Sequence, residues 1–355
     1  MTERRPSGHR IRPIASSSIF GPGSKRTGAE KADEESDLRN VDLSPTANPS
    51  DFRGKVECVK NSFRPLESGE PIGVVALSGP VEEELLEEGL AVLRGWGHPI
   101  VESSNLRRRE SYLAGSDSER VAGVGEVLDA GARFIIAARG GYGASRIMPS
   151  MPWRRLIEEK ACFVGFSDLT GILNPLVGRG GAVQIHGPMV AAGLSRRHNG
   201  GRLGSALRGE LFGEVLFQFP QRSVARHGRV SGRAMGGNLS LLTSLIGTPW
   251  EPDFDDCVVF IEEVGEPVYR LDRMLTHLGA SGRLRKVKAL IGGSLRGCRP
   301  ASERSEVWRR LLLEAAPDDA AVVVDLPFGH GATNLAFPIG STVALDTRAR
   351  RVTWG

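Results

Sequence analysis

The sequence predicts an α/β protein built on a parallel sheet, and three observations lead to this fold class. Short apolar runs recur along the chain, they lack the apolar–polar alternation of half-exposed strands, and segments of helical periodicity separate them. Strands of a parallel sheet are covered by helices on both faces, so they are apolar along their whole length. The alternation of such strands with helices therefore favours a parallel α/β sheet.

The first half of the chain supplies the clearest of these elements. The predicted strands are 73–77, 133–138 and 161–166. Each is a short buried run that breaks into a turn or a glycine-containing loop. One predicted helix presents Leu86, Leu90 and Leu93 on a single face, and another covers residues 118 to 130.

The second half contains further strands and one amphipathic helix. Strands are expected at 257–261, 286–292, 320–326, 341–346 and near the C-terminus. The helix over residues 266 to 279 presents Leu271, Met274, Leu275 and Leu278. These four side chains recur at helical spacing, so they form one apolar face.

We expect the chain to divide into a tail, two domains and a linker. The predicted segments are a disordered tail over 1–55, an N-terminal domain over 68–195, a linker over 196–229 and a C-terminal domain over 230–355. The tail is polar and has no apolar period, so it cannot bury enough surface to offset its ordering entropy. Deleting it should leave the fold intact. Two alternatives stay open for this tail: a basic tether to a partner, or an overlong predicted start of the chain.

Composition excludes several classes of protein. A chain of 355 residues with 40% hydrophobic and 25% charged residues suits one or two soluble domains. It lacks the roughly 18 continuous apolar residues of a membrane helix, and a formal charge of +4 with scattered arginines does not indicate nucleic-acid binding. The cysteines are Cys58, Cys162, Cys257 and Cys298. They form no CxxC pair, so free buried thiols and a reducing compartment, the cytoplasm, are expected.

Ser167 follows a predicted strand in the segment Gly165-Phe-Ser-Asp168. A serine on a tight turn between a strand and a helix has an exposed hydroxyl, and the N–H groups at the helix start can stabilise an oxyanion. Leu169 stands where a G-x-S-x-G motif would have its second glycine. Considered alone, Ser167 would more often be a helix N-cap, since serine is a favoured capping residue.

The segment Arg139-Gly140-Gly141-Tyr-Gly143 also follows a strand. Glycines let a backbone approach a ligand closely and leave its N–H groups accessible. The spacing matches neither a dinucleotide fingerprint nor a P-loop. A ligand-binding loop and a plain tight turn both stay open.

His330 and Glu262 each stand at the end of an apolar run. His330 lies between two glycines in Pro327-Phe-Gly-His-Gly331, where an accessible imidazole could act as a general base. Glu262 follows Val258-Val-Phe-Ile261, and a carboxylate there could orient a histidine. Considered alone, Glu262 would more often be a solvated strand end or a structural ion pair.

Taken in order, the motifs resemble one family. They are Gly73 to Pro80, 139–143, Gly165 to Asp168, His186-Gly-Pro-Met189, Gly236-Gly-Asn-Leu239, Gly247-Thr-Pro249, Phe260-Ile-Glu-Glu263, Tyr269 to Arg273 and Pro327 to His330. This series, spanning about residues 70 to 350, resembles the LD-carboxypeptidases, which include murein tetrapeptide carboxypeptidase and the microcin C self-immunity peptidases. The departures are Phe166 for the family's frequent tyrosine and Glu263 for its frequent aspartate.

The resemblance implies a fold and a site. The fold would be an N-terminal Rossmann-like parallel-sheet domain plus a smaller C-terminal α/β domain with a β-barrel-like, swivelling sheet. The implied catalytic residues are Ser167, Glu262 and His330, and the implied oxyanion donors are the N–H groups of Gly141 and Asp168. Candidate substrate-binding residues are Ser78, Gly79, Arg139, Gly140, His186 and Asn238. No metal or organic cofactor is expected.

The resemblance also implies a function: removal of a terminal D-amino acid, D-alanine, from a cytoplasmic murein tetrapeptide by a homodimeric enzyme that binds neither nucleic acid nor membrane. An alternative within the family is cleavage of a peptidyl-nucleotide antibiotic, which would require an aromatic platform; Trp250 is the tryptophan nearest the second-half motifs. A non-catalytic ligand-binding homologue is a further alternative. A nucleotide-binding oxidoreductase is disfavoured, because the dinucleotide fingerprint is missing.

Overall fold

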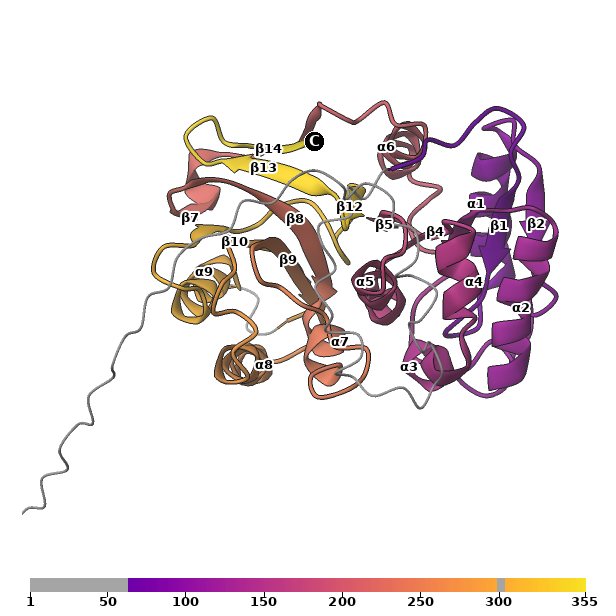
Figure 1. The fold of residues 1–355 in the computed structure, drawn as a ribbon, viewed down its shortest axis with the longest axis horizontal. Helices are drawn as coiled ribbons and strands as arrows, with labels where there is room; N and C mark the ends of the chain where they lie inside the picture. The colour runs from indigo at the N-terminus through magenta and orange to yellow at the C-terminus, as the bar shows by residue number, and fades with distance from the viewer. Residues whose placement is uncertain (1–62, 299–303) are drawn as a thin grey trace, which may run out of the picture. The chain divides into compact units, whose positions relative to one another are not determined.

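The computed structural model describes residues 63–298 and 304–355. The predicted tail and Cys58 lie outside these ranges. Two sheets with surrounding helices make up the described residues (Figure 1). Within them, no helix is long and apolar enough to cross a bilayer.

The first sheet has six strands. They are β1 (Ile72–Val75), β2 (Ile100–Glu102), β3 (Phe134–Ala137), β4 (Cys162–Gly165), β5 (Gln184–His186) and β12 (Phe337–Ile339). Their order is β12-β5-β4-β3-β1-β2. Every neighbouring pair is parallel except β12 and β5, which are antiparallel. The predicted parallel α/β sheet is thus confirmed, and its three sequence-predicted strands are β1, β3 and β4.

Helices connect these strands. They are α1 (Glu83–Arg94), α2 (Asp117–Asp129), α3 (Ala144–Ile147), α4 (Trp153–Glu158), α5 (Thr170–Gly178) and α6 (Arg197–Leu207), with 3-10 turns η3 (Met148–Ser150) and η4 (Ser167–Leu169). Helix α1 buries Leu86, Leu90 and Leu93, the predicted face. Helix α2 starts at a capping box, in which Ser116 and Glu119 satisfy each other's backbone N–H groups.

The second sheet has eight strands. They are β6 (Val215–Gln218), β7 (Val224–Arg226), β8 (Arg229–Asn238), β9 (Cys257–Val264), β10 (Ala289–Arg296), β11 (Ala321–Val323), β13 (Thr342–Asp346) and β14 (Arg351–Trp354). Their order is β6-β14-β13-β8-β9-β10-β11-β7. The central strands β8, β9, β10 and β11 are parallel, and antiparallel strands flank them on both sides.

Three helices and a short 3-10 turn accompany the second sheet. They are α7 (Leu239–Ser244), α8 (Val268–Ala280), α9 (Arg304–Ala315) and η5 (Gln221–Ser223). Helix α9 contacts β7, β10 and β11, and α8 packs on α7 and α9 (Figure 1). Helix α8 buries Leu271, Leu275 and Leu278, as its sequence pattern predicts.

The segment 196–229 has more structure than its weak periodicity suggests. It carries α6, β6, η5 and β7, and both strands pair within the second sheet. Strand β12, from the second half of the chain, completes the first sheet instead. These short elements owe their place to pairing with distant strands. The domain limits given above stay a prediction.

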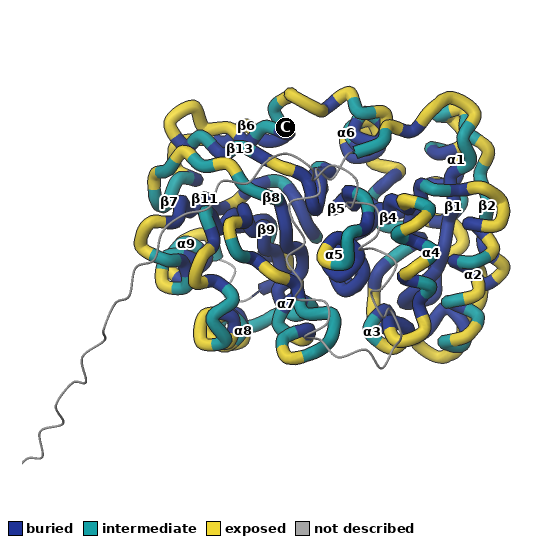
Figure 2. Tube along the Cα trace, viewed as in Figure 1, coloured by how far each residue is buried: buried dark blue, intermediate teal, exposed yellow. Residues whose placement is uncertain are grey.

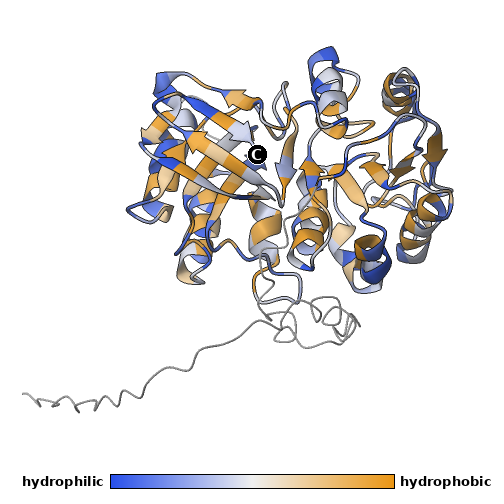
Figure 3. Ribbon diagram, turned by 45° about the horizontal axis from the view of Figure 1, so that its top comes forward, coloured by the Kyte–Doolittle hydropathy of each residue, from blue (hydrophilic) through white to orange (hydrophobic). Residues whose placement is uncertain are grey.

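Buried apolar side chains fill the strands of both sheets. Figure 2 shows the strands as mostly buried and the outward surfaces of the helices as exposed. Figure 3 shows the same division in hydropathy, with apolar residues concentrated in the strands. Cys162, Cys257 and Cys298 are free and buried, as expected for three of the four cysteines. Burial raises the pKa of the Cys162 thiol to about 12, so this thiol is unreactive.

Candidate active site

Ser167 stands on a sharp turn between β4 and the helical segment formed by η4 and α5. Its φ is +60°, a left-handed conformation that is unfavourable for a residue with a side chain. The turn also requires Gly165, because a Cβ there would lie 2.8 Å from the side chain of Leu169. Leu169 fills the place of the second motif glycine, and the chain keeps a nucleophile-elbow geometry in spite of it.

His330 and Glu262 complete a hydrogen-bonded series with Ser167. The His330 Nε2 atom lies 3.1 Å from Ser167 Oγ, and its Nδ1 atom lies 2.6 Å from Glu262 Oε2. Glu262 is fully buried two residues before the end of β9, whereas 17% of the His330 side chain is exposed. A carboxylate that accepts from Nδ1 leaves Nε2 free to accept the serine proton. This arrangement can activate a hydroxyl for attack on a carbonyl carbon.

The loop before His330 fits closely around the carboxylate. Gly329 has a φ of +90°, and a Cβ there would lie 2.4 Å from Glu262 Oε2. The His330 N–H donates to the same carboxylate oxygen at 3.2 Å. On the other side, the Phe166 ring meets the imidazole edge to face at 4.9 Å. The imidazole is therefore held by contacts on several sides.

Asn238 supports Glu262 from the neighbouring strand. The two residues are register partners at the ends of the parallel strands β8 and β9. Asn238 Nδ2 donates to Glu263 Oε1 at 2.9 Å and, at 3.4 Å, to Glu262 Oε1. Its Oδ1 caps α7 by accepting from Leu241 N. Asn238 is 3% exposed, so it orients the carboxylate rather than offering an open binding group.

Helix α5 fastens the serine turn to the second sheet. Thr170 Oγ1 accepts from Asn238 N at 3.0 Å. Asn174 accepts from the N–H of Gly236 at 2.9 Å and donates to its carbonyl at 2.8 Å. These side chains connect the element that carries Ser167 to the strand beside Glu262. The alignment of the three residues therefore rests on fixed contacts between the two sheets.

The glycine loop lies directly against the serine. A Cβ at Gly140 would lie 3.0 Å from Ser167 Cβ and 3.1 Å from its Oγ. Gly141 has a φ of +123°. This places the peptide between Gly140 and Gly141 beside the hydroxyl, where an oxyanion would form. The roles of Gly141 and Asp168 as N–H donors stay predictions that this geometry supports.

The Asp168 side chain braces two loops. Its Oδ2 accepts from Ser78 Oγ at 2.5 Å and from Ala144 N at 2.8 Å. Burial raises the pKa of the Asp168 carboxyl, while the bonds from Ser78 and Ala144 oppose that rise. The Gly79 N–H donates to Gly140 O at 3.2 Å. Ser78 and Gly79 are thus engaged within the protein rather than free to bind a ligand.

Arg120 joins the same loops from the opposite side. Its guanidinium is completely buried and donates through Nη1 to the carbonyls of Leu77 at 2.5 Å and Gly143 at 2.9 Å. Asp117 accepts from its Nη2. No local sequence pattern marks Arg120, Thr170 or Asn174, because each bonds to backbone groups far away in the chain.

Arg139 and His186, two further predicted substrate-binding residues, also contact other parts of the protein. Arg139 donates through Nη1 to Pro80 O at 2.8 Å. His186 is fully buried and stacks on Phe337 with ring centroids 4.5 Å apart. Burial, with a smaller contribution from the nearby His330, lowers the pKa of His186 to about 3. Packing explains His186 better than contact with a substrate.

The fold and site together define a class: α/β proteins in which a serine, a histidine and a carboxylate form one hydrogen-bonded series. The comparisons with known proteins agree with this class. The LD-carboxypeptidase N-terminal domain matches residues 72–187, and the LD-carboxypeptidase C-terminal domain matches residues 231–345. The chain belongs to the LD-carboxypeptidase family, a family of peptide hydrolases.

Individual relatives cover most of the chain. The murein tetrapeptide carboxypeptidase of Pseudomonas aeruginosa is 32% identical over 295 residues, which is 80% of this chain and 94% of that protein. A solved muramoyltetrapeptide carboxypeptidase from Oxalobacter formigenes superposes with a TM-score of 0.68 at 27% identity, covering 79% of this chain and 97% of the other. A structure of MccF in complex with glutamyl sulfamoyl guanosine gives a TM-score of 0.74 at 20% identity, covering 83% and 98%. The MccF likeness concerns the fold alone.

Proposed function

We propose that this chain is a serine L,D-carboxypeptidase that releases the terminal D-alanine from a cytoplasmic murein tetrapeptide during cell-wall recycling. The observation that carries the proposal is the series Glu262–His330–Ser167, with contacts of 2.6 and 3.1 Å. The name of the Pseudomonas relative, at 32% identity, supports the substrate class.

The proposed reaction proceeds through an acyl-enzyme. His330 Nε2 takes the proton of Ser167 as its Oγ attacks the amide carbonyl carbon between the L-centre and the D-residue. The N–H groups of Gly141 and Asp168 stabilise the oxyanion, and Glu262 stabilises the imidazolium. His330 then donates its proton to the leaving amine. Water, activated by the same histidine, hydrolyses the ester and regenerates Ser167. The reaction requires no metal or organic cofactor.

A peptidyl-nucleotide substrate is the second candidate. Support for it comes from relatives named for microcin immunity, one of them the Escherichia coli MccF at 22% identity over 79% of this chain. The murein relatives are closer in sequence, so we prefer the tetrapeptide. A panel that contains both substrate types separates the two, since the preferred one should have the higher kcat/KM.

One experiment tests both the proposed reaction and the proposed roles of Ser167, His330 and Glu262. Purified protein is incubated with a muramoyl or free tetrapeptide ending in D-alanine, and the products are weighed by mass spectrometry. We expect the tripeptide and D-alanine, slower release from the L-alanine epimer, and no effect of EDTA. Ser167→Ala, His330→Ala and Glu262→Gln should each lower kcat by roughly 10⁴-fold, with double variants little worse. Near-normal turnover in Ser167→Ala would exclude a serine nucleophile.

We also propose a homodimer, as the family resemblance implies. Light scattering coupled to size exclusion checks this, and a monomeric mass at micromolar concentration would contradict it. The cytoplasmic location is checked by cell fractionation with a thiol-reduced marker protein as reference.

A further inference from the structure

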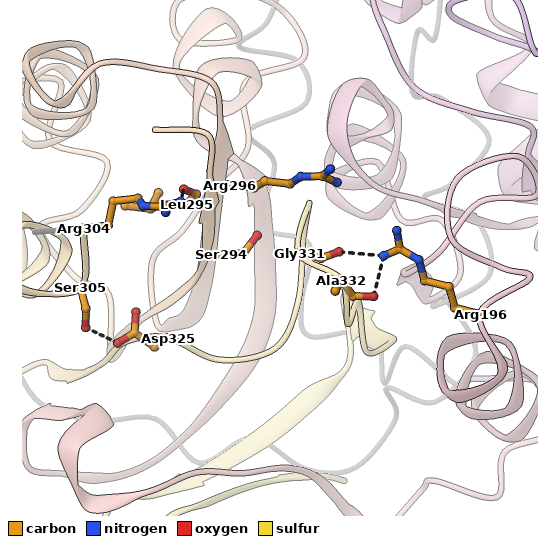
Figure 4. Close-up of a pocket in the computed structure, with 9 residues that line it drawn as sticks. All are labelled: Arg196, Ser294, Leu295, Arg296, Arg304, Ser305, Asp325, Gly331 and Ala332. Carbon is orange, nitrogen blue, oxygen red and sulfur yellow. Dashed lines mark hydrogen bonds between the residues drawn. The ribbon is translucent and has the colours of Figure 1, made fainter. Parts of the chain in front are cut away.

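A cavity of about 630 Å³ lies next to the loop that carries the catalytic histidine. Its lining includes Gly331 and Ala332, which directly follow His330, and the side chains of Arg196, Arg296 and Arg304. Figure 4 shows Arg196 and Arg296 extending toward each other from opposite sides, over Gly331 and Ala332. Arg196 precedes α6 and Arg296 ends β10, so cationic side chains from both halves of the chain line the cavity.

Both arginines donate hydrogen bonds to backbone carbonyls of the loop that carries His330. Arg296 Nη1 donates to His330 O at 3.4 Å. Arg196 Nη1 donates to Ala332 O at 2.6 Å and to Gly331 O at 3.4 Å. Each arginine has five N–H donors, and these contacts to neutral carbonyls use only one nitrogen of each guanidinium. The remaining donors of each guanidinium can serve an anion.

The charge of the cavity is unbalanced. Within residues 63–298 and 304–355, neither Arg196 nor Arg296 has a carboxylate within ion-pair distance. The cavity's carboxylate, Asp325, bonds instead to Ser305 Oγ at the start of α9. Ser294, also in the lining, has a buried hydroxyl without a hydrogen-bond partner among the described residues. Convergent guanidiniums and an unsatisfied hydroxyl together favour a bound carboxylate.

We propose that Arg196 and Arg296 bind the terminal carboxylate of the leaving D-amino acid and thereby select a chain end. The inference rests on the proposed function. The leaving nitrogen must face His330 Nε2 to receive its proton, and the carboxylate is only two covalent bonds from that nitrogen. The leaving residue therefore lies on the histidine side of Ser167, and the cavity is lined by Gly331 and Ala332 of the loop that carries this histidine. Two of the predicted substrate-binding residues, Ser78 and Gly79, already bond within the protein.

The test compares two substrates in several variants. A tetrapeptide ending in D-alanine and its C-terminal amide are given to the wild type, Arg196→Gln, Arg296→Gln and the control Arg310→Gln. Arg310 pairs with Glu314 on the exposed surface of α9. We expect the acid to exceed the amide in kcat/KM by tenfold to a hundredfold in the wild type and the control, which is the usual effect of a charge-assisted contact. Each cavity variant should reduce this ratio to within about threefold of unity.

The ratio separates binding from positioning. Loss of Arg296 could disturb His330 and lower kcat on both substrates, but that effect cancels in the acid-to-amide ratio. A ratio that stays at the wild-type value in both cavity variants overturns the proposal while the proposed function stands. A second measurement needs no turnover: N-acetyl-D-alanine should protect Ser167 from a fluorophosphonate better than its amide does in the wild type and in the control, but not in the two cavity variants. If the wild type neither releases D-alanine nor reacts with the fluorophosphonate, both proposals are wrong.

Discussion

The hydroxyl of Ser78 donates a 2.5 Å hydrogen bond to Oδ2 of Asp168, ninety positions further along the chain. The same oxygen accepts from Ala144 N, so one carboxylate joins the loops after β1 and β3 to the serine turn after β4. These three loops follow neighbouring strands of a parallel sheet, whose carboxyl ends meet at one edge. The geometry around Ser167 thus depends on a side chain that does not itself react.

Asp168→Asn should weaken this brace. Because Ser78 and Ala144 donate to the same oxygen, an asparagine keeps both contacts, but it lacks the negative charge that strengthens them, at a cost of about 1 kcal/mol. We expect a loss of stability of that size and a lower kcat, because the loops beside Ser167 shift. Urea denaturation and steady-state kinetics measure both. Asp129→Asn, at an exposed salt bridge with Arg155, is the control and should change neither.

Gly329→Ala should displace the carboxylate of Glu262. The new Cβ would lie 2.4 Å from Glu262 Oε2, and the φ of +90° disfavours any side chain at this position. A misplacement of about 1 Å at a catalytic group can cost roughly a hundredfold in rate, so kcat should fall by about that factor. Gly178→Ala is the matched control, since a Cβ there meets nothing within 4 Å. Equal kcat values for the two variants would show that the loop adapts.

Ser167→Gly and Ser167→Ala should both be inactive but should differ in stability. At the observed φ of +60° an alanine keeps the strain of the turn, whereas a glycine relieves it. We expect the glycine variant to be more stable by about 1 kcal/mol, measured by urea denaturation. The same pair at Ser118, an exposed position inside α2, should show the reverse order, because glycine destabilises a helix. An equal stability of the two Ser167 variants would mean that the turn carries no strain.

Strands that lie in long apolar runs could be predicted from the sequence. Strands β3 and β4 came directly from the runs 133–138 and 161–166, because buried strands of a parallel sheet are continuously apolar. Strands β5 and β12 escaped prediction: each has three residues, and they pair with each other, β5 also with β4. Three residues are too few to show a periodicity, so tertiary pairing decides the structure of these two segments.

The candidate site likewise contains some residues that the sequence indicates and others that it does not. Ser167 and His330 stand in local patterns, a serine after a strand and a histidine between glycines, that carry chemical meaning without a structure. Glu262 gained its role from the order of the motifs. Arg120 could not be predicted, because a buried guanidinium that bonds to the carbonyls of Leu77 and Gly143 looks like any helical arginine in sequence. Such residues act through distant backbone groups that only the folded chain brings near.

The last prediction concerns His186, whose two ring nitrogens lack hydrogen-bond partners among the described residues. Burial lowers its pKa to about 3 in the folded protein, whereas an unfolded chain has a pKa near 6.5. Between these values the unfolded state binds more protons than the folded one, so the free energy of unfolding decreases as the pH falls. Above about pH 6.5 His186 is neutral in both the folded and the unfolded state, so it no longer lowers the free energy of unfolding.

His186→Leu should therefore flatten the pH dependence of stability. Over pH 6 to 4 the wild type should lose stability more steeply than the variant, by on the order of 1.4 kcal/mol per pH unit. Chemical denaturation at several pH values gives both slopes, and any constant packing loss cancels in the comparison. His277→Gln, on the exposed face of α8, is the control and should keep the wild-type slope. A raised KM in His186→Leu together with an unchanged slope would contradict the packing interpretation and favour contact with the substrate.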